Sequence, residues 1–180
     1  PRKFKIAITG SIKDRALVQC HDIGLEFFTN TNNKMSIKVW VGGGLGRTPI
    51  VGSVIKKELE WEHILTYCEA ILRVYNLYGR RDNMYKARIK ILVKSLGIEA
   101  FKKLVEDEWN YIKNGPNTIN TEELNRIKKY FSEPDYKKNI KNNLQDYASN
   151  KAFNQWLSRS TNTHKKKGYR AVTFSLKETG

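Results

Sequence analysis

The sequence is poor in the features that mark several protein classes. Its two cysteines, Cys20 and Cys68, lie far apart, so they form neither the close pair of a metal or cluster site nor a disulfide framework. A reducing, cytoplasmic setting suits them better than a disulfide, and we expect both to be packing residues. No apolar run approaches the ~18–20 residues of a membrane-spanning helix, and no signal peptide or internal repeat is recognisable. The sequence therefore predicts no membrane span.

Positive charge is the feature that the chain has in excess. Its 180 residues suffice for one domain with room for an appendage, and 33 Lys and Arg against 18 Asp and Glu give a net charge of +15. This charge indicates nucleic acid, an acidic membrane surface or a ligand rich in carboxylates or phosphates. We interpret the lysine tract at 165–167 as a solvated face. Because the chain starts at a proline inside an apparent strand, we expect it to be a fragment of a longer protein.

A glycine-rich turn follows an apolar strand at residues 39–49 and ends at Arg47. Glycine lets the backbone approach a flat or anionic ligand closely, because it has no Cβ and reaches positive φ freely. An ordinary surface loop would have the same appearance. Basic segments at 1–5 and 79–88 accompany the turn, and together the three suggest a polyanionic ligand.

The hydrophobic pattern changes near residue 50 from a period of two to a period of three to four, which predicts an α+β fold. We expect a small, mainly antiparallel sheet covered by helices. The strands are predicted at residues 3–9, 17–25 and 37–42, and the helices at 61–78, 83–96 and 99–114. On the first strand Phe4, Ile6 and Ile8 share one face, so that Lys3 and Lys5 project together from the other.

Helix signals mark several boundaries in the second half. Asp82 is a candidate cap for the helix at 83–96, and Asn120 followed by Glu123 predicts a short fourth helix. Residues 132–150 are polar and predict a surface helix or a mobile connection. After them Phe153, Trp156 and Leu157 make an apolar anchor, and residues 171–177 read as a strand without an evident partner.

The basic run at 79–88 offers two columns of cations. Arg81 and Arg88 would lie within ~20° of each other on a continuous helix, and Lys86 and Lys90 would form a second column. Guanidinium groups bind carboxylates in two-pronged fashion, which suits a ligand with several carboxylates. A solvated basic helix face is an equally good interpretation of this run taken alone.

Four segments of the chain together resemble the siroheme-containing sulfite and nitrite reductases. The resemblance is specifically to the first siroheme-contacting domain of their hemoprotein component. The segments are PRKFK at 1–5, HDIG at 21–24, VGGGL at 41–45 and the basic run at 79–88. The resemblance covers residues 1–115, which we take as a siroheme and anion-site domain. It thins over a polar, helical connection at 116–167, and returns at 168–180 in what looks like a strand opening the family's second repeat.

The resemblance implies a six-electron reduction of sulfite to sulfide, or of nitrite to ammonia, at a siroheme coupled to a 4Fe-4S cluster. It places Lys3 and Lys5 in the anion pocket as catalytic residues, where clustered cations hold the anion and donate protons. It implies an electron donor such as ferredoxin or a flavoprotein, and no metal ligand in this chain. The residues that it implies for siroheme binding are Arg2, Gly42, Gly43, Gly44, Leu45, Arg47, Arg81, Lys86 and Arg88.

The sequence departs from the family pattern in two ways. The cysteines that hold the cluster in the family are missing, so the ligands of a 4Fe-4S cluster must lie outside this chain, and a preceding half-domain is missing too. We therefore expect the isolated chain to be inactive. His21 could be read as a metal ligand, but a hydrogen-bonded strand histidine is the better interpretation.

Two alternatives remain beside sulfite reduction. Nitrite reduction belongs to the same family, but Lys5 favours sulfite, because family members that reduce nitrite tend to have asparagine at this position. A basic nucleic-acid-binding module using residues 165–170 belongs to a different class. No recognised nucleic-acid motif supports that module, and the reductase interpretation already accounts for much of the positive charge.

Overall fold

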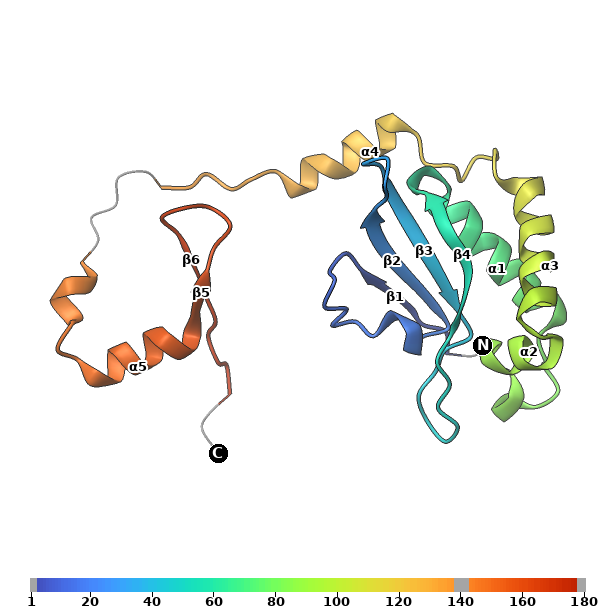
Figure 1. Cartoon of the computed structure of the whole chain (residues 1–180), viewed down its shortest axis with the longest axis horizontal. Helices are drawn as coiled ribbons and strands as arrows, with labels where there is room; N and C mark the ends of the chain where they lie inside the picture. The colour runs from blue at the N-terminus through green and yellow to red at the C-terminus, as the bar shows by residue number, and fades with distance from the viewer. Residues whose placement is uncertain (1–2, 138–142, 178–180) are drawn as a thin grey trace. The chain divides into compact units, whose positions relative to one another are not determined.

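The computed structural model describes residues 3–137 and 143–177. They form two compact units, of which the first runs to Ser132 and the second starts at Glu133. In the first unit three helices lie on one face of a four-stranded sheet (Figure 1), which confirms the predicted α+β class. None of the helices in the described part of the chain is long and apolar enough to cross a membrane.

The sheet is mainly antiparallel, as predicted, with one parallel pair. Strand β1 pairs with β2 in parallel, whereas β2 with β3 and β3 with β4 are antiparallel. The spatial order follows the sequence, so β1 and β4 are the edges. The strands are β1 (Ile6–Thr9), β2 (Ile23–Thr29), β3 (Met35–Val41) and β4 (Ser53–Glu60).

The predicted strand at 17–25 is wrong in its first half. A short 3-10 helix, η1 (Val18–Cys20), occupies this position, and the strand runs from Ile23 to Thr29 instead. The cause is a turn in which the Asp14 carboxylate accepts a hydrogen bond of 3.0 Å from the Val18 amide. Leu17 within it has a left-handed φ of 51°. The turn belongs to the connection of residues 10–22 that separates β1 from β2, and a parallel pair requires such a long connection rather than a hairpin.

Strand β1 is shorter than predicted and its apolar residues face outward. Regular pairing starts at Ile6 rather than Lys3. Ile6 and Ile8 are 48% and 57% exposed, whereas Thr9 is buried. Phe4, just before the strand, packs against the core. Alternation therefore identified an extended segment, but it did not identify which face is buried.

Strand β4 was not predicted. Ile55 and Leu59 are its deeply buried apolar residues, and they are four positions apart. A spacing of four fits one face of a strand as well as one turn of a helix, and register shifts interrupt the pairing of β4 with β3 between Ile37 and Trp40. A bulged edge strand with charged residues between its core residues does not show strict alternation.

The helices bury an apolar stripe against the sheet. The predicted helices at 61–78 and 99–114 are confirmed as α1 (Ile64–Tyr78), preceded by the 3-10 helix η2 (Trp61–His63), and α3 (Ile98–Ile112). The fourth helix is also confirmed as α4 (Thr121–Lys128), continued by η4 (Lys129–Phe131). Asn120 caps α4 by accepting a hydrogen bond of 2.8 Å from the Glu123 amide. Tyr67, Ile71 and Phe101 are the large buried side chains that the helices contribute to the core.

The predicted helix at 83–96 is broken. A 3-10 helix, η3 (Met84–Lys86), and the α-helix α2 (Ile89–Leu96) replace it, with Arg88 in extended conformation between them. Asp82 is not the cap: its carboxylate pairs with Arg80, and Asn83 caps η3 instead by accepting from the Tyr85 amide. Because no continuous helix joins them, Arg81 and Arg88 do not form a column, and neither do Lys86 and Lys90.

The second unit is small and built around aromatic side chains. Its elements are η5 (Leu144–Tyr147), α5 (Lys151–Ser160), β5 (Thr161–Thr163) and β6 (Arg170–Val172). The rings of Phe153 and Trp156 stack with centroids 5.8 Å apart, in keeping with the predicted anchor. The strand predicted at 171–177 is shorter in the structure, where β6 ends at Val172 and residues 173–177 are irregular. It also has a partner, since β6 pairs with β5; the missing partner was a wrong prediction because β5 is short and polar.

Candidate functional site

Asp22 is the residue on which three of the basic and glycine-rich segments meet. It is completely buried. One carboxylate oxygen, Oδ2, accepts hydrogen bonds from the Lys5 amide at 2.9 Å and from Arg88 Nη2 at 2.6 Å. The other, Oδ1, accepts from Arg88 Nε at 3.0 Å. The Asp22 carbonyl oxygen accepts from the Gly42 amide at 3.0 Å. Residues far apart in the sequence are thereby fixed around one carboxylate.

Arg88 has one guanidinium nitrogen left for a ligand. Its Nε and Nη2 are both bound to Asp22, and its side chain is 17% exposed. Among residues 3–137 and 143–177, no group forms a hydrogen bond with Nη1. The fixed planar guanidinium therefore directs Nη1 away from Asp22, where it could bind a carboxylate.

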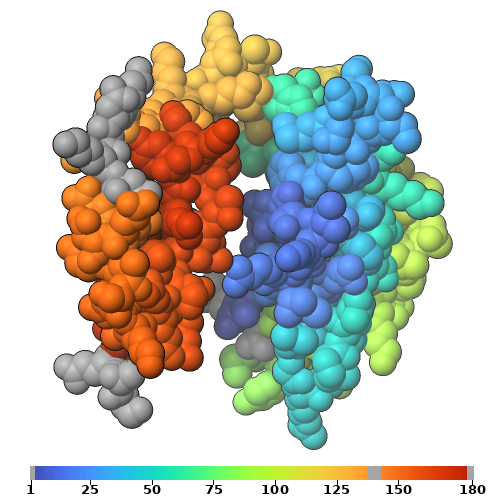
Figure 2. Space-filling view, turned by 60° about the vertical axis from the view of Figure 1, so that its left-hand side comes forward, coloured from blue at the N-terminus to red at the C-terminus, as the bar shows by residue number. Residues whose placement is uncertain are grey.

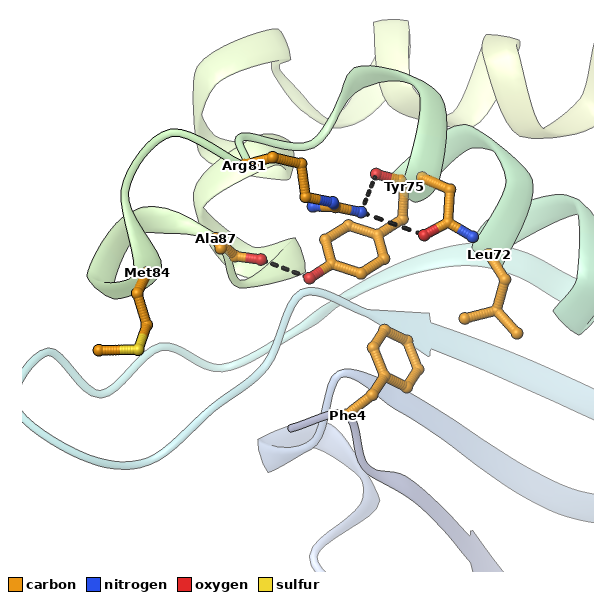
Figure 3. Close-up of a pocket in the computed structure, with 7 residues that line it drawn as sticks. Phe4, Leu72, Tyr75, Arg81, Met84 and Ala87 are labelled. Carbon is orange, nitrogen blue, oxygen red and sulfur yellow. Dashed lines mark hydrogen bonds between the residues drawn. The ribbon is translucent and has the colours of Figure 1, made fainter. Parts of the chain in front are cut away.

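A pocket of about 510 Å³ lies between the segment before β1 and the loop that follows α1. Its wall includes the Tyr75 ring, whose hydroxyl donates to the Ala87 carbonyl oxygen (Figure 3). The Arg81 guanidinium lies over this ring, 4.7 Å from its centroid, and donates to the Tyr75 carbonyl oxygen. Phe4 faces the same ring with centroids 5.6 Å apart. The pocket thus combines aromatic walls with one cation at its rim.

Gly42, Gly43 and Gly44 of the turn are packed against the protein itself. A Cβ on Gly43 would lie 2.2 Å from the Gln19 carbonyl oxygen, so no larger residue fits there without movement of the backbone. At Gly42, with φ of 81°, a Cβ would contact Val93 at 3.2 Å. At Gly44 it would contact the Lys90 side chain at 3.3 Å. Gly42 and Gly43 therefore have a structural reason to be glycine, whereas at Gly44 the flexible Lys90 side chain could move aside.

The predicted anion and cofactor residues otherwise lie on the surface. Lys3 and Lys5 are exposed, as is Lys86 in η3. Figure 2 shows the start of the first unit, dark blue, at the surface of that unit. Leu45, 64% exposed, and Arg47 lie in the loop that connects β3 to β4. Arg2 lies outside the described residues.

The structure therefore joins some predicted site residues and leaves others apart. Asp22 links Lys5 with Arg88 and Gly42, and the pocket links Arg81 with the segment around Phe4. Leu45 and Arg47 neither bond to Asp22 nor line the pocket. Asp22 itself was not predicted as a functional residue. The sequence feature that could have identified it is an acidic residue directly before a buried strand, in the HDIG segment at 21–24 that carried only the family resemblance.

His21 and the cysteines provide no metal centre. His21 Nε2 lies 3.1 Å from the Ala16 carbonyl oxygen, so the histidine is hydrogen-bonded as expected, although it precedes β2. Burial raises the pKa of Cys68 to about 11, and this thiol packs against the core. No group of three or more His, Cys, Asp or Glu in the described ranges could hold a metal ion. The residues present thus do not fit an iron–sulfur cluster.

The match to a family model decides the relationship. Residues 1–113 match the model for the nitrite and sulphite reductase 4Fe-4S domain. The chain belongs to this family. The match covers the sheet and helices α1 to α3, together with Asp22, Arg88, the glycine turn and the pocket.

Similar proteins from several organisms carry sulfite reductase names. Sulfite reductase (ferredoxin) 1 of Mycolicibacterium paratuberculosis is 31% identical over 109 residues, which is 61% of this chain and 19% of that protein. The sulfite reductase (NADPH) hemoprotein beta-component of Staphylococcus haemolyticus is 35% identical over 114 residues, 59% of this chain and 19% of that protein. The chain thus spans about a fifth of the length of these family members.

A solved structure shows a partial likeness as well. The Mycobacterium tuberculosis NirA protein is 26% identical, and the match covers 52% of this chain and 17% of that one, with a TM-score of 0.49.

Proposed function

We propose that this chain is the siroheme-contacting part of a longer enzyme that reduces sulfite to sulfide. Membership of the nitrite and sulphite reductase family supports this, as do the sulfite reductases among the similar proteins. The observation that carries the proposal is the junction at Asp22, because it holds the lysine segment and an arginine of the basic loop on one buried carboxylate. An anion pocket and a carboxylate-binding site would then adjoin.

The described residues fit the acidic rim of a siroheme. Arg88 offers Nη1, and Arg81 and Lys86 offer exposed cations on the same loop. We assign these three residues to the carboxylates of the macrocycle, with Arg2, Arg47, Leu45 and the three glycines as further contacts. When bound, siroheme supplies an iron that takes up the anion and delivers electrons to it.

Lys3 and Lys5 are the proposed catalytic residues. Their exposed ammonium groups would hold the sulfite dianion by charge-assisted hydrogen bonds. Reduction of sulfite consumes six electrons, and its three oxygens leave as water, so protons must reach those oxygens. Ammonium groups in contact with the anion are suited to donate them. The main chain of Lys5 is fixed by Asp22, which leaves only its side chain to move.

The electrons have to arrive from outside this chain. Its residues do not fit the 4Fe-4S cluster, so we place the cluster ligands elsewhere in the longer protein. We propose ferredoxin or a flavoprotein as the electron donor. Without the cluster and the remaining walls of the site, the isolated chain should produce no sulfide.

The test uses the full-length protein that contains this chain, purified with siroheme. We expect the absorption spectrum of siroheme, and sulfide production with reduced methyl viologen as the donor. Lys3→Met should lower kcat/KM for sulfite at least tenfold, since a charge-assisted contact contributes about 1.5–3 kcal/mol. Lys13→Met is the matched control, because Lys13 is also exposed and lies in the turn after β1.

Four results would contradict the proposal. A colourless full-length protein would show that no siroheme is bound. Sulfide production unaffected by Lys3→Met would show that Lys3 does not bind the anion. Ammonia production from nitrite with no sulfide from sulfite would identify the other activity of the family. Salt-dependent binding of nucleic acid by a colourless protein would favour the basic nucleic-acid-binding module instead.

A further inference from the structure

We infer that Asp22 is a positioning residue of the anion site, which fixes Lys5 and Arg88 relative to each other. The inference rests on the proposed function, because it assigns a role in sulfite binding to a residue that itself touches no substrate. Asp22 is completely buried, so its carboxylate cannot contact an anion in the pocket. Its effect has to pass through the groups that it holds.

Both carboxylate oxygens of Asp22 accept hydrogen bonds. Two oxygens accept three bonds, one from the Lys5 amide and two from Arg88. The backbone of Lys5 also accepts a bond of 3.1 Å from the Ile23 amide, so both polar main-chain groups of Lys5 are tied to the segment 22–23. The position from which the Lys5 side chain emerges is therefore fixed before regular pairing of β1 begins.

Charge explains why this carboxylate should be an aspartate. The segments that meet here carry Lys3, Lys5, Lys86 and Arg88, and like charges repel one another. The buried negative charge of Asp22, between the backbone of Lys5 and the guanidinium of Arg88, offsets part of that repulsion from the protein interior. The solvent-exposed side of the site stays positive for an anionic ligand. A neutral acceptor would supply hydrogen bonds without this offset.

The Arg80–Asp82 pair provides an internal comparison. It has the same residue types and the same two-pronged geometry, since Arg80 Nε donates to Asp82 Oδ1 at 2.9 Å and Nη2 donates to Oδ2. However, Asp82 is exposed and its partner lies only two positions away. It joins nothing distant in the sequence, so its loss should leave the geometry of the anion site unchanged.

The experiment compares Asp22→Asn with Asp82→Asn in the full-length holoenzyme. An amide replaces one of the two accepting oxygens by an NH2 group, so Asp22→Asn cannot satisfy all three donors of Lys5 and Arg88. Its neutral oxygen also binds the Lys5 amide more weakly than a carboxylate does. We expect KM for sulfite to rise and kcat/KM to fall roughly ten- to a hundredfold per siroheme, as for other misplaced binding groups. Exchange of the Lys5 amide hydrogen should become faster. Asp82→Asn should change neither quantity.

A double variant separates positioning from stability. If Asp22 acts through Lys5, then Asp22→Asn should add little to the effect of Lys5→Met on kcat/KM. If Asp22 only stabilises the fold, the two effects multiply, or activity falls solely with the amount of folded, siroheme-loaded enzyme, and the inference is overturned. Where Asp22→Asn does not fold, Asp22→Glu replaces it, since it keeps the buried charge and displaces the carboxylate from the Lys5 amide.

Failure of the proposed function is distinguishable from failure of this inference. A wild-type enzyme that makes no sulfide contradicts the function, and the amide exchange of Lys5 then decides the role of Asp22 by itself. Unchanged exchange in Asp22→Asn overturns the inference in either case. In a sulfite-reducing enzyme, faster exchange of the Lys5 amide with an unchanged KM for sulfite in Asp22→Asn overturns it too. That result would show that fixing the Lys5 backbone does not affect sulfite binding.

Discussion

Asp22 and Arg88 form a two-pronged ion pair between residues 66 positions apart. The carboxylate is fully buried and the arginine side chain is 17% exposed. A buried pair adds little stability compared with apolar residues of the same size, but removing one partner leaves the other charge unpaired at a cost of about 3–5 kcal/mol. The pair therefore makes the fold of residues 3–132 dependent on the loop before α2.

Our first prediction follows from this asymmetry. Arg88→Met should lower the free energy of unfolding by about 3–5 kcal/mol, because Asp22 is left without its cation. Arg88→Lys should cost less, since the charge remains. Urea unfolding followed by circular dichroism measures both. Arg80→Met is the control and should cost much less stability than Arg88→Met, because its ion pair with Asp82 is exposed; an equal loss in the two methionine variants would show that burial is not the cause.

The second prediction concerns pH and the exposed pair. A hydrogen bond from Arg80 lowers the pKa of Asp82 from its ordinary 3.8 to about 2. Because the folded pKa is the lower one, the stabilisation is present above pH 3.8 and is lost as the pH falls towards 2. An NMR titration should give a midpoint of about 2 for Asp82, and a midpoint near the ordinary value in Arg80→Met. The same midpoint in both proteins would disprove the hydrogen bond.

Much of the fold could be predicted because long periodic segments report burial directly. Helices α1 and α3 carry an apolar residue every three or four positions, and Gly79 and Gly97 lie at their ends. The errors lie where a side chain overrides the local pattern. Asp14 makes a turn of a segment that alternates like a strand. In β4 the shifted register hides the alternation.

The sequence predicted which types of residue make up the site, but not how they are arranged in space. Basic and glycine-rich segments pointed to a polyanionic ligand, but the geometry proposed for Arg81 and Arg88 assumed one helix and was wrong. The structure brings Arg88 to Lys5 through Asp22, a contact over a long sequence separation. Spacing along the chain cannot reveal such a contact, because it depends on the parallel β1–β2 pair and on the break before α2.

A third prediction tests what the glycine turn is for. A Cβ on Gly43 would meet backbone at 2.2 Å, whereas one on Gly46 would meet nothing within 4 Å. Gly43→Ala should therefore lower the melting temperature of the chain even without any cofactor. Gly46→Ala is the control and carries only the cost of its φ of 126°. If Gly43→Ala melts like the wild type but fails to bind siroheme in the full-length enzyme, contact with the macrocycle is the stronger constraint.

The fourth prediction concerns a polar cluster that joins β4 to helices α1 and α3. The Tyr67 hydroxyl donates to Glu106 at 2.7 Å, and Lys56 from β4 donates to the same carboxylate at 2.9 Å. Burial, followed by this hydrogen bond, raises the pKa of Tyr67 above its ordinary value. Tyr67→Phe should lower the free energy of unfolding by about 1–2 kcal/mol, because Glu106 loses a donor.

Two measurements check this cluster. Urea unfolding compares Tyr67→Phe with Tyr111→Phe, a control on α3, the helix that carries Glu106; Tyr111 is 86% exposed. Absorbance titration of tyrosine should give the same curve near pH 10 for the wild type and Tyr67→Phe, since Tyr67 does not ionise there in the folded protein. A curve that loses one tyrosine near pH 10 in the variant would contradict the buried hydrogen bond.

The last prediction concerns the choice of substrate and depends on Lys5. Sulfite near neutral pH is substantially a dianion and nitrite is a monoanion, so a second ammonium group favours sulfite. Asparagine offers hydrogen bonds without a charge. A charge-assisted contact contributes about 1.5–3 kcal/mol, which corresponds to a tenfold or greater preference. In the full-length enzyme Lys5→Asn should lower kcat/KM for sulfite by at least that factor and leave nitrite reduction equal or improved.

The structure makes Lys5→Asn a selective change. Asp22 and Ile23 hold the main chain of Lys5, which every substitution except proline retains, and the Lys5 side chain is exposed rather than packed. The fold should therefore tolerate the variant, and steady-state kinetics with the two anions reports the side chain alone. Lys13→Asn controls for the loss of a surface charge. If both substrates lose efficiency together while the siroheme content falls, Lys5 binds the macrocycle, and the preference for sulfite has to come from another residue.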